Sequence, residues 1–244
     1  SSGSLIFMLI GFLSGIASGA GVIISGAFGA GDIPKLQKAV HTTVAMGLVA
    51  GLIMTGIGVV LPPKILLWMD TPQNVMPQSV AYLQIYFSGS LGFVLYNIFV
   101  GILQAVGDSR HPLYYLIASS VINLVLDIVF IEVFHTGVGG AALATVISQV
   151  ISALLCFRQL HRTRETYRLQ LRRIRFDGKL LKKILMVGLP SGVQSSIISF
   201  ANVVVQSNIN AFGEMAMAGY GAYSKVEGFG FLPTNSFNMA LTTF

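Results

Sequence analysis

Charged side chains are scarce in this sequence. Only 10% of its 244 residues are Asp, Glu, Lys or Arg, whereas a soluble domain carries about 25%. Hydrophobic residues make up 54%, and the mean hydropathy is +0.76. With so few charges and so many apolar residues, the composition excludes a domain that is kept in solution by charged side chains on its surface. Cysteine is rarer still: Cys156 stands alone, which excludes a disulfide framework and a cysteine metal cluster.

The two ends of the sequence also lack familiar signals. No methionine and no charged segment precede the first apolar run, so the sequence does not predict a signal peptide. The chain begins, after SSGS, inside one apolar run and stops at LTTF inside another. We therefore expect a fragment of a longer membrane protein.

Long apolar runs are what the sequence does contain. Each run can cross the ~30 Å hydrocarbon core of a bilayer, which takes ~20 helical residues. A soluble protein of buried core helices is improbable with so many runs in succession. We predict an all-α, polytopic transmembrane bundle. The runs are residues 5–28, 38–61, 78–106, 112–134, 138–158, 184–211 and 218–244.

Basic residues are concentrated in one place, because ten of the fifteen Lys and Arg residues lie between Arg158 and Lys183. Lys35 and Arg110 add charge to two other loops, while the alternate loops carry only Lys64. Loops rich in Lys and Arg stay in the cytoplasm. The long basic stretch is therefore more typical of a topology signal and an anionic-lipid contact than of a nucleic-acid site. The loops predicted to be cytoplasmic are 29–37, 107–111 and 159–183.

The basic loop also divides the chain. We predict an N-terminal lobe at 1–158, a cytoplasmic inter-lobe loop at 159–183 and the start of a second lobe at 184–244. FLPTNSFNMALTTF (231–244) can be aligned weakly with FLSGIASGAGVIIS (12–25). Weak internal symmetry of this kind is common in secondary transporters.

One polar pair stands inside an apolar run. In INLVLDIVF, Asn123 and Asp127 are four residues apart and share a helix face, which Ser119 extends by one turn. The next run carries a matching stripe of small and polar residues: Ala141, Thr145, Ser148 and Ser152.

The two stripes are expected to meet, because a short loop makes their helices antiparallel neighbours. Asp127 and Thr145 each lie seven residues from the expected helix ends, so both sit ~10 Å from the same membrane face. We predict that Asn123, Asp127 and Thr145 share one pocket.

Two uses of that pocket follow from its chemistry. Carboxylate, amide and hydroxyl oxygens suit a hard cation, and a carboxylate in a low dielectric can instead hold a proton. A hydrogen-bonded cluster that locks two helices together is the alternative. Intramembrane carboxylates are costly and mostly functional, so we favour a site for Na⁺ or H⁺, with no other metal and no cofactor.

The last two runs carry weaker candidates. Glu227 is either a second ionisable site or an ordinary interfacial residue, and the four histidines (His41, His111, His135 and His161) are expected to be solvated because they stand at run ends or in loops. An uncharged stripe favours a substrate cleft or helix–helix hydrogen bonding about equally. Its members are Ser195, Ser199, Asn202 and Gln206.

Five segments together resemble the multidrug and toxic compound extrusion family. They are GILQAVGDSRHP (101–112), the Asn123/Asp127 pair, GVGGAALAT (137–145), GLPSGVQ (188–194) and KVEGFGFLP (225–233). The resemblance covers nearly the whole chain, and its specificity lies in the order and spacing of the segments.

The resemblance implies two six-helix lobes around a central cleft, of which this chain holds helices two to eight. It implies cation-coupled antiport of organic, often cationic, compounds by a multi-pass protein of the cell membrane, working as a monomer when full length. The family's cation site maps onto Asn123, Asp127 and Thr145, and its further Asp on the first helix is missing here. An acid on the family's eighth helix corresponds to Glu227.

Other functions fit less well. An intramembrane serine protease would need a Gly-x-Ser-Gly nucleophile and a histidine in mid-membrane, and a metalloenzyme would need clustered ligands, so we predict no enzyme. A channel is harder to separate from a transporter. A related lipid or polysaccharide exporter is the closest alternative, but its cleft should be strongly cationic. The substrate and the choice between Na⁺ and H⁺ stay open.

Overall fold

The protein is an all-helical bundle in the computed structural model, which describes residues 2–64, 76–210 and 214–243. No strand occurs in these ranges, so the predicted all-α fold is confirmed. The helices are α1 (Ser2–Gly29), α2 (Ile33–Val60), α4 (Met76–Ser88), α5 (Ser90–Ala105), α6 (Arg110–Ile128), a π-helical turn (Val129–Val133), α7 (Gly137–Arg162), a 3₁₀ turn (Leu171–Arg173), α8 (Gly178–Asn210) and α9 (Glu214–Thr243).

Within the described part of the chain, four helical segments are long and apolar enough to cross a membrane, and five if a bent pair counts as one span. They are Ile33–Val60, Arg110–Val133, Gly139–Arg162 and Gly178–Asn202, with the bent pair Ser79–Ser88 and Ser90–Ala105. The first and last apolar runs form α1 and α9, whose role as spans stays a prediction.

The bent pair corrects one expectation, a single helix over 78–106. Gly89 separates α4 from α5, and the two helices meet at 45°. A Cβ on Gly89 would lie 2.6 Å from the side chain of Val146 on α7. The bend therefore occurs where only glycine lets the passing helix approach this closely.

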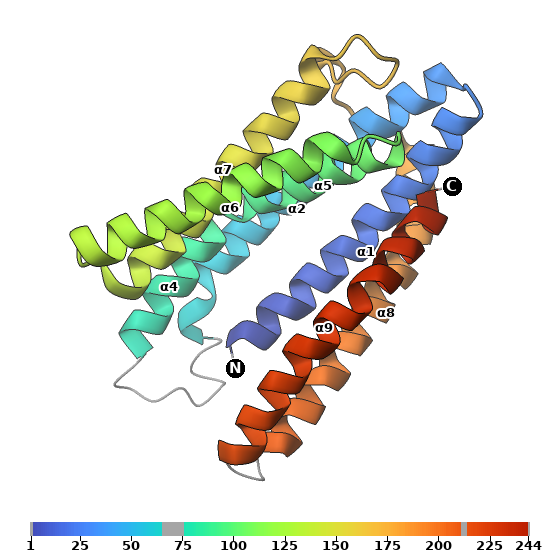
Figure 1. The fold of residues 1–244 in the computed structure, drawn as a ribbon. Helices are drawn as coiled ribbons and strands as arrows, with labels where there is room; N and C mark the ends of the chain where they lie inside the picture. Colours follow the sequence, from blue (N-terminus) through green and yellow to red (C-terminus); the bar gives the residue numbers. More distant parts are fainter. Residues whose placement is uncertain (1, 65–75, 211–213, 244) are drawn as a thin grey trace.

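The described loops sort to the two ends of the bundle as the charge pattern predicts, while most of the 61–77 loop lies outside the described residues. In Figure 1 the α1–α2, α5–α6 and α7–α8 connections lie at one end, and the α6–α7 turn lies at the other. The α7–α8 loop contacts the start of α2, where the side chain of Gln37 donates to the carbonyl of Thr166. The grouping is confirmed, whereas the side of the membrane stays a prediction.

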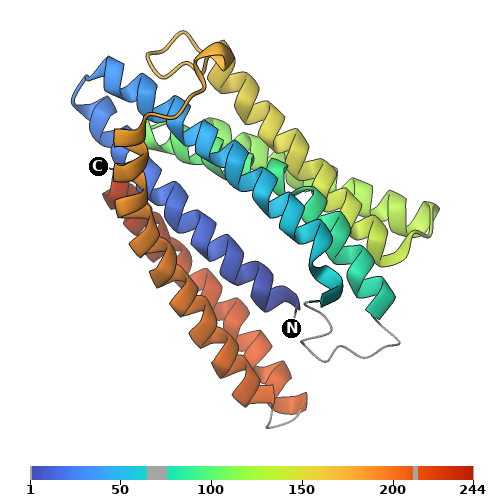
Figure 2. The same ribbon diagram turned by 180° about the vertical axis from the view of Figure 1, so that it is seen from behind.

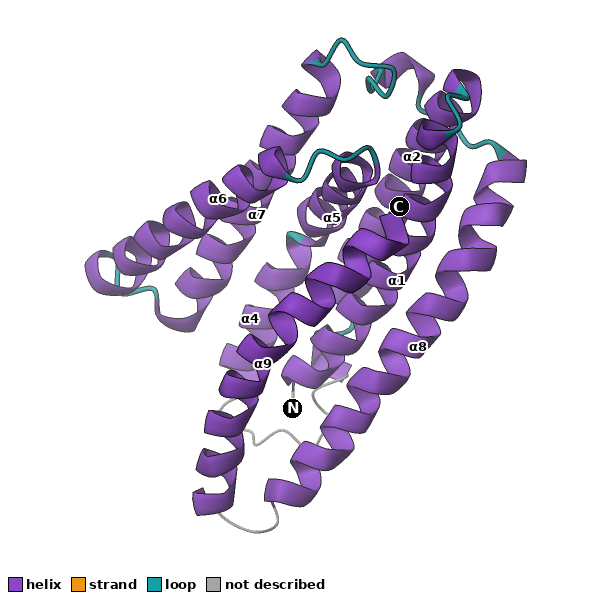
Figure 3. Cartoon of the chain, turned by 45° about the vertical axis from the view of Figure 1, so that its right-hand side comes forward, coloured by secondary structure: helices purple, strands orange, loops and turns teal. Residues whose placement is uncertain are grey.

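Helix α1 lies at the centre, between α2 and α5 on one side and α8 and α9 on the other (Figure 3). Its contact with α8 is the most extensive in the bundle. A Cβ on Gly15 would lie 2.2 Å from the backbone nitrogen of Gly192, and one on Gly19 would lie 2.5 Å from Cα of Gly188. Two Gly-x-x-x-Gly segments thus bring the two backbones into direct contact, as in close-packed membrane helices.

Candidate functional site

The two sides of α6 differ sharply. Leu124 and Ile128 are 61% and 53% exposed, as side chains that face lipid would be. Asn123 and Asp127 are half-buried, Ser119 is buried, and α6 packs against α7. The polar stripe predicted from the sequence therefore lies on the covered side of its helix.

Two polar atoms of this stripe are shielded from solvent. Oδ1 of Asp127 and Nδ2 of Asn123 have no hydrogen-bond partner among the described residues. A buried polar group without a partner is costly, and a charged one more so. Turning the Asn123 amide over would place its oxygen where its nitrogen lies. The pair therefore fits a hard cation or a proton better than a closed hydrogen-bonded cluster.

The backbone changes type next to Asp127. Helix α6 ends at Ile128, and the π-helical turn follows at once, with the N–H of Phe134 donating to the carbonyl of Val129 at 3.1 Å. Single π-helical turns inside helices occur frequently at functional sites. This turn was not expected within the 112–134 run, which contains neither Gly nor Pro near Asp127.

Thr145 lies on the neighbouring helix at a comparable depth. Asp127 is six residues from Val133 and Thr145 is eight from Gly137, so their depths are ~9 and ~12 Å. The Thr145 hydroxyl donates to the carbonyl of Ala141 at 3.0 Å, which leaves its oxygen free to accept. Within the described chain no hydrogen bond joins Thr145 to Asn123 or Asp127, so their convergence stays a prediction.

The candidates in the second half lie on other helices. Ser195 and Ser199 are half-buried on α8 and Asn202 is exposed, while the side chain of Gln206 lies outside the described part. Glu227 on α9 is half-buried and accepts a hydrogen bond of 3.0 Å from the hydroxyl of Tyr223. Their roles in binding stay predictions.

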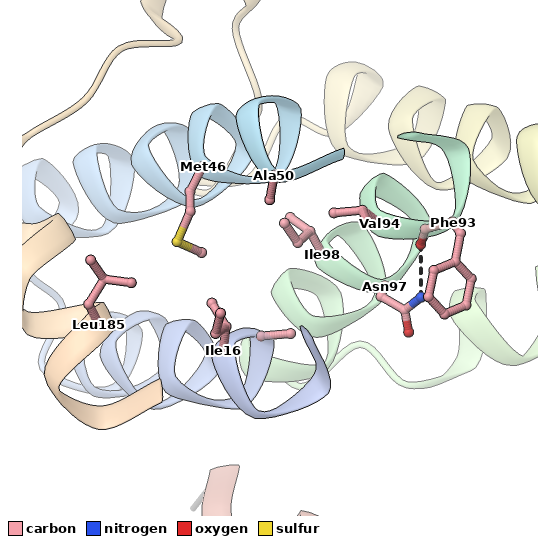
Figure 4. A pocket seen from close by; sticks show the side chains of 10 residues that line it. Ile16, Met46, Ala50, Phe93, Val94, Asn97, Ile98 and Leu185 are labelled. Atoms are coloured by element: carbon pink, nitrogen blue, oxygen red, sulfur yellow. Dashed lines mark hydrogen bonds between the residues drawn. The ribbon is translucent and has the colours of Figure 1, made fainter. Parts of the chain in front are cut away.

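A small cavity was not foreseen from the sequence. It has a volume of about 80 Å³ and lies between α1, α2, α5 and α8 (Figure 4). Asn97 lines it together with apolar side chains such as Met46 and Leu185, and its amide nitrogen donates to the carbonyl of Phe93 at 2.8 Å. The cavity is far below the ~300 Å³ of a drug-sized pocket. The signal for Asn97 was available: it is a carboxamide in an apolar run, like Asn123.

One expectation about the histidines is wrong. His41 is only 3% exposed, although it was expected to be solvated. Its Nδ1–H donates to the carbonyl of Gln37 at 2.6 Å, and its Nε2 accepts from the N–H of Gln170 at 3.0 Å. The α7–α8 loop covers this residue, and a contact between positions so far apart in the sequence leaves no local signal.

Comparison with known proteins places this geometry in context. The family model MatE matches residues 1–129. The chain is 32% identical to the probable multidrug resistance protein YoeA of Bacillus subtilis, over 98% of this chain and 53% of that protein. It is 26% identical to the probable multidrug resistance protein NorM of Thermotoga maritima, over 92% and 49%. The chain thus spans about half the length of the curated relatives it matches.

Solved structures agree over 98% of the chain. A MATE protein in complex with MaL6 gives a TM-score of 0.90 at 27% identity, over 54% of its own chain. An outward-facing multidrug resistance MATE transporter gives 0.86 at 27%, and an inward-facing one 0.78 at 28%, over 53% and 55% of their chains. The MatE model matches more than half of this chain, and the helices follow the fold of the solved MATE structures. This membrane protein therefore belongs to the MatE family.

Proposed function

We propose that this chain is part of a cation-coupled antiporter of the cell membrane, which exports organic, cationic, drug-like compounds. The observation that carries the proposal is the shielded, unpartnered carboxylate oxygen of Asp127 on the covered side of a membrane helix. The relatives that are named multidrug resistance proteins support the export of drugs, and membership of a transporter family supports a function other than catalysis.

Asp127 would carry the coupling step. Burial disfavours the charged carboxylate, whereas a bound cation or a proton relieves that cost. Na⁺ and H⁺ would compete for the same oxygen, with Asn123 and Thr145 supplying neutral oxygens to the cation. Na⁺ or H⁺ can shift the transporter from one conformation to another only if the ion binds the two conformations with different affinity. The stripe on α8, Ser195 among its members, would then offer uncharged polar contacts to the substrate.

The contact between α1 and α8 would supply the moving part. It joins the first half of the chain to the second through backbone contacts at Gly19 and Gly188. The higher TM-score against the outward-facing transporter, at nearly equal identity, supports an outward-facing arrangement in which this contact closes the opposite side. Alternating access would require α1 and α8 to separate.

Dye efflux from vesicles tests the function. The full-length protein is reconstituted with a fluorescent organic cation, and an inward Na⁺ or H⁺ gradient is imposed separately. We expect efflux above that of protein-free vesicles under at least one gradient, and none above it after the gradient is collapsed with an ionophore. Efflux that persists unchanged without any gradient would favour a channel, and export of anionic lipid alone would favour the lipid exporter.

A further inference from the structure

The α7–α8 loop, residues 163–177, is fixed to α2 by hydrogen bonds. Figure 2 shows it running from α7 across α2 to α8. The N–H of Gln170 donates to His41 at 3.0 Å, and the N–H of Asp177 donates to the hydroxyl of Thr42 at 3.1 Å. Both acceptors are buried side chains, with exposures of 3% and 0%.

Two apolar side chains of the same loop are also packed in the hydrophobic core. Tyr167 and Leu169 are 8% and 0% exposed and belong to the hydrophobic core, together with Leu36 and Val40 of α2. The loop is therefore a packed part of the bundle.

The attachment points set the depth of the loop. His41 lies eight residues from the start of α2 at Ile33, or ~12 Å along the helix axis. The 28 residues of α2 span ~42 Å, which matches a bilayer with its headgroup layers. The start of α2, which holds Lys35 and Lys38, takes up the headgroup layer at that end, and the apolar run begins at residue 38. His41 lies three residues, or ~4.5 Å, into that run, so the loop is attached close to the boundary between the headgroups and the acyl chains.

At this level the loop exposes apolar and cationic side chains together. Leu171 and Phe176 are 56% and 50% exposed. Arg172, Arg173 and Arg175 are exposed as well, and none of the three forms an ion pair with a carboxylate in the described ranges. The nearby Asp177 instead pairs with Lys38 at 3.6 Å.

We propose that these five residues form a binding surface for anionic phospholipids. Guanidinium groups bind phosphate with two parallel hydrogen bonds. Exposed Leu and Phe side chains beside them suit the boundary between headgroups and acyl chains. The members of this lipid surface are Leu171, Arg172, Arg173, Arg175 and Phe176.

A tryptophan placed in the lipid surface tests the proposal. Phe176→Trp is made in the full-length protein after its native tryptophans, Trp68 among them, are replaced by Phe. The protein enters nanodiscs of one phosphatidylcholine–phosphatidylglycerol mixture, with bromine on either one lipid or the other. The matched control is Phe134→Trp, an exposed residue at the other end of the bundle.

Bromine quenches tryptophan fluorescence on contact, so the loss of fluorescence reports which lipid lies next to the tryptophan. Each basic residue favours an anionic surface by roughly fivefold, so we expect quenching per phosphatidylglycerol to exceed that per phosphatidylcholine by about twofold or more. The control position should show no preference. Replacing the three arginines by Gln should remove the preference for phosphatidylglycerol without abolishing quenching. Salt at molar concentration should weaken that preference in the unsubstituted protein.

Three results would overturn the proposal. Equal quenching by both lipids would mean that the arginines do not select anionic lipid. No quenching by either would place the surface in water, where a soluble partner could bind it. Loss of the preference on adding inorganic phosphate at constant ionic strength would assign the surface to a soluble phosphate.

Discussion

The contact between Gly19 and Gly188 should control the opening of the bundle. In Gly19→Ala the new Cβ would lie 2.5 Å from both Cα and N of Gly188, which are backbone atoms and cannot rotate away. Carbon atoms pack at ~3.5–4.0 Å, so α1 and α8 must separate by about 1 Å or more. Overpacking of this kind costs ~1–3 kcal/mol. If the cost falls on the closed contact alone, the equilibrium shifts ~5- to 150-fold towards separated helices.

Distances between spin labels would measure this shift. One label is placed at Tyr114 on α6 and the other at Met186 on α8, both exposed, in a variant that lacks Cys156. The matched control is Gly21→Ala on the same helix, where nothing lies within 4 Å of the added Cβ. Gly19→Ala should enlarge the population with changed distance, and Gly21→Ala should not. Identical distributions for the two variants would refute the reasoning.

Three further predictions concern the basic end of the bundle. His41→Phe removes the acceptor for the N–H of Gln170, so hydrogen exchange at that amide should become faster by ~5-fold or more. His135→Phe should leave that exchange rate unchanged. Hydrogen bonds from the backbone, first that of Leu180, lower the pKa of Asp177, so its contribution to stability is full above the usual pKa near 4 and is lost as pH falls through the lowered value. Thermal unfolding of Asp177→Asn should therefore match the parent protein only in acid. A cysteine at Arg173 should resist impermeant thiol reagents in intact cells, and labelling from outside would contradict the predicted topology.

Helix positions were predictable because the apolar runs have the length of the spans. Run limits agree with α2 and α7 to within five residues, since apolar composition changes sharply at the loops. The bend at Gly89 was not predictable in the same way. The run stays apolar through residues 78–106, and the bend depends on contact with Val146, a residue far along the chain.

The candidate site was predictable in part. Spacing alone placed Asn123 and Asp127 on one face, and the structure places that face on the covered side of α6. The π-helical turn that follows has no marker residue, and the burial of His41 depends on a loop over a hundred residues away. Local patterns predict which side chains share a face, whereas tertiary contacts decide what covers them.

The central claim is that Asp127 carries the coupling ion, and gradient-driven efflux by Asp127→Asn tests it most directly. The substitution keeps the side-chain shape and removes the charge, and Asp32→Asn serves as the control because Asn also caps helix α2 well. We expect Asp127→Asn to fall to the rate of protein-free vesicles at equal inserted protein. Thr145→Ala should lose less, and Asp32→Asn should keep the parent rate. If Asp127→Asn exports at the parent rate under both Na⁺ and H⁺ gradients, Asp127 is structural and the account is wrong.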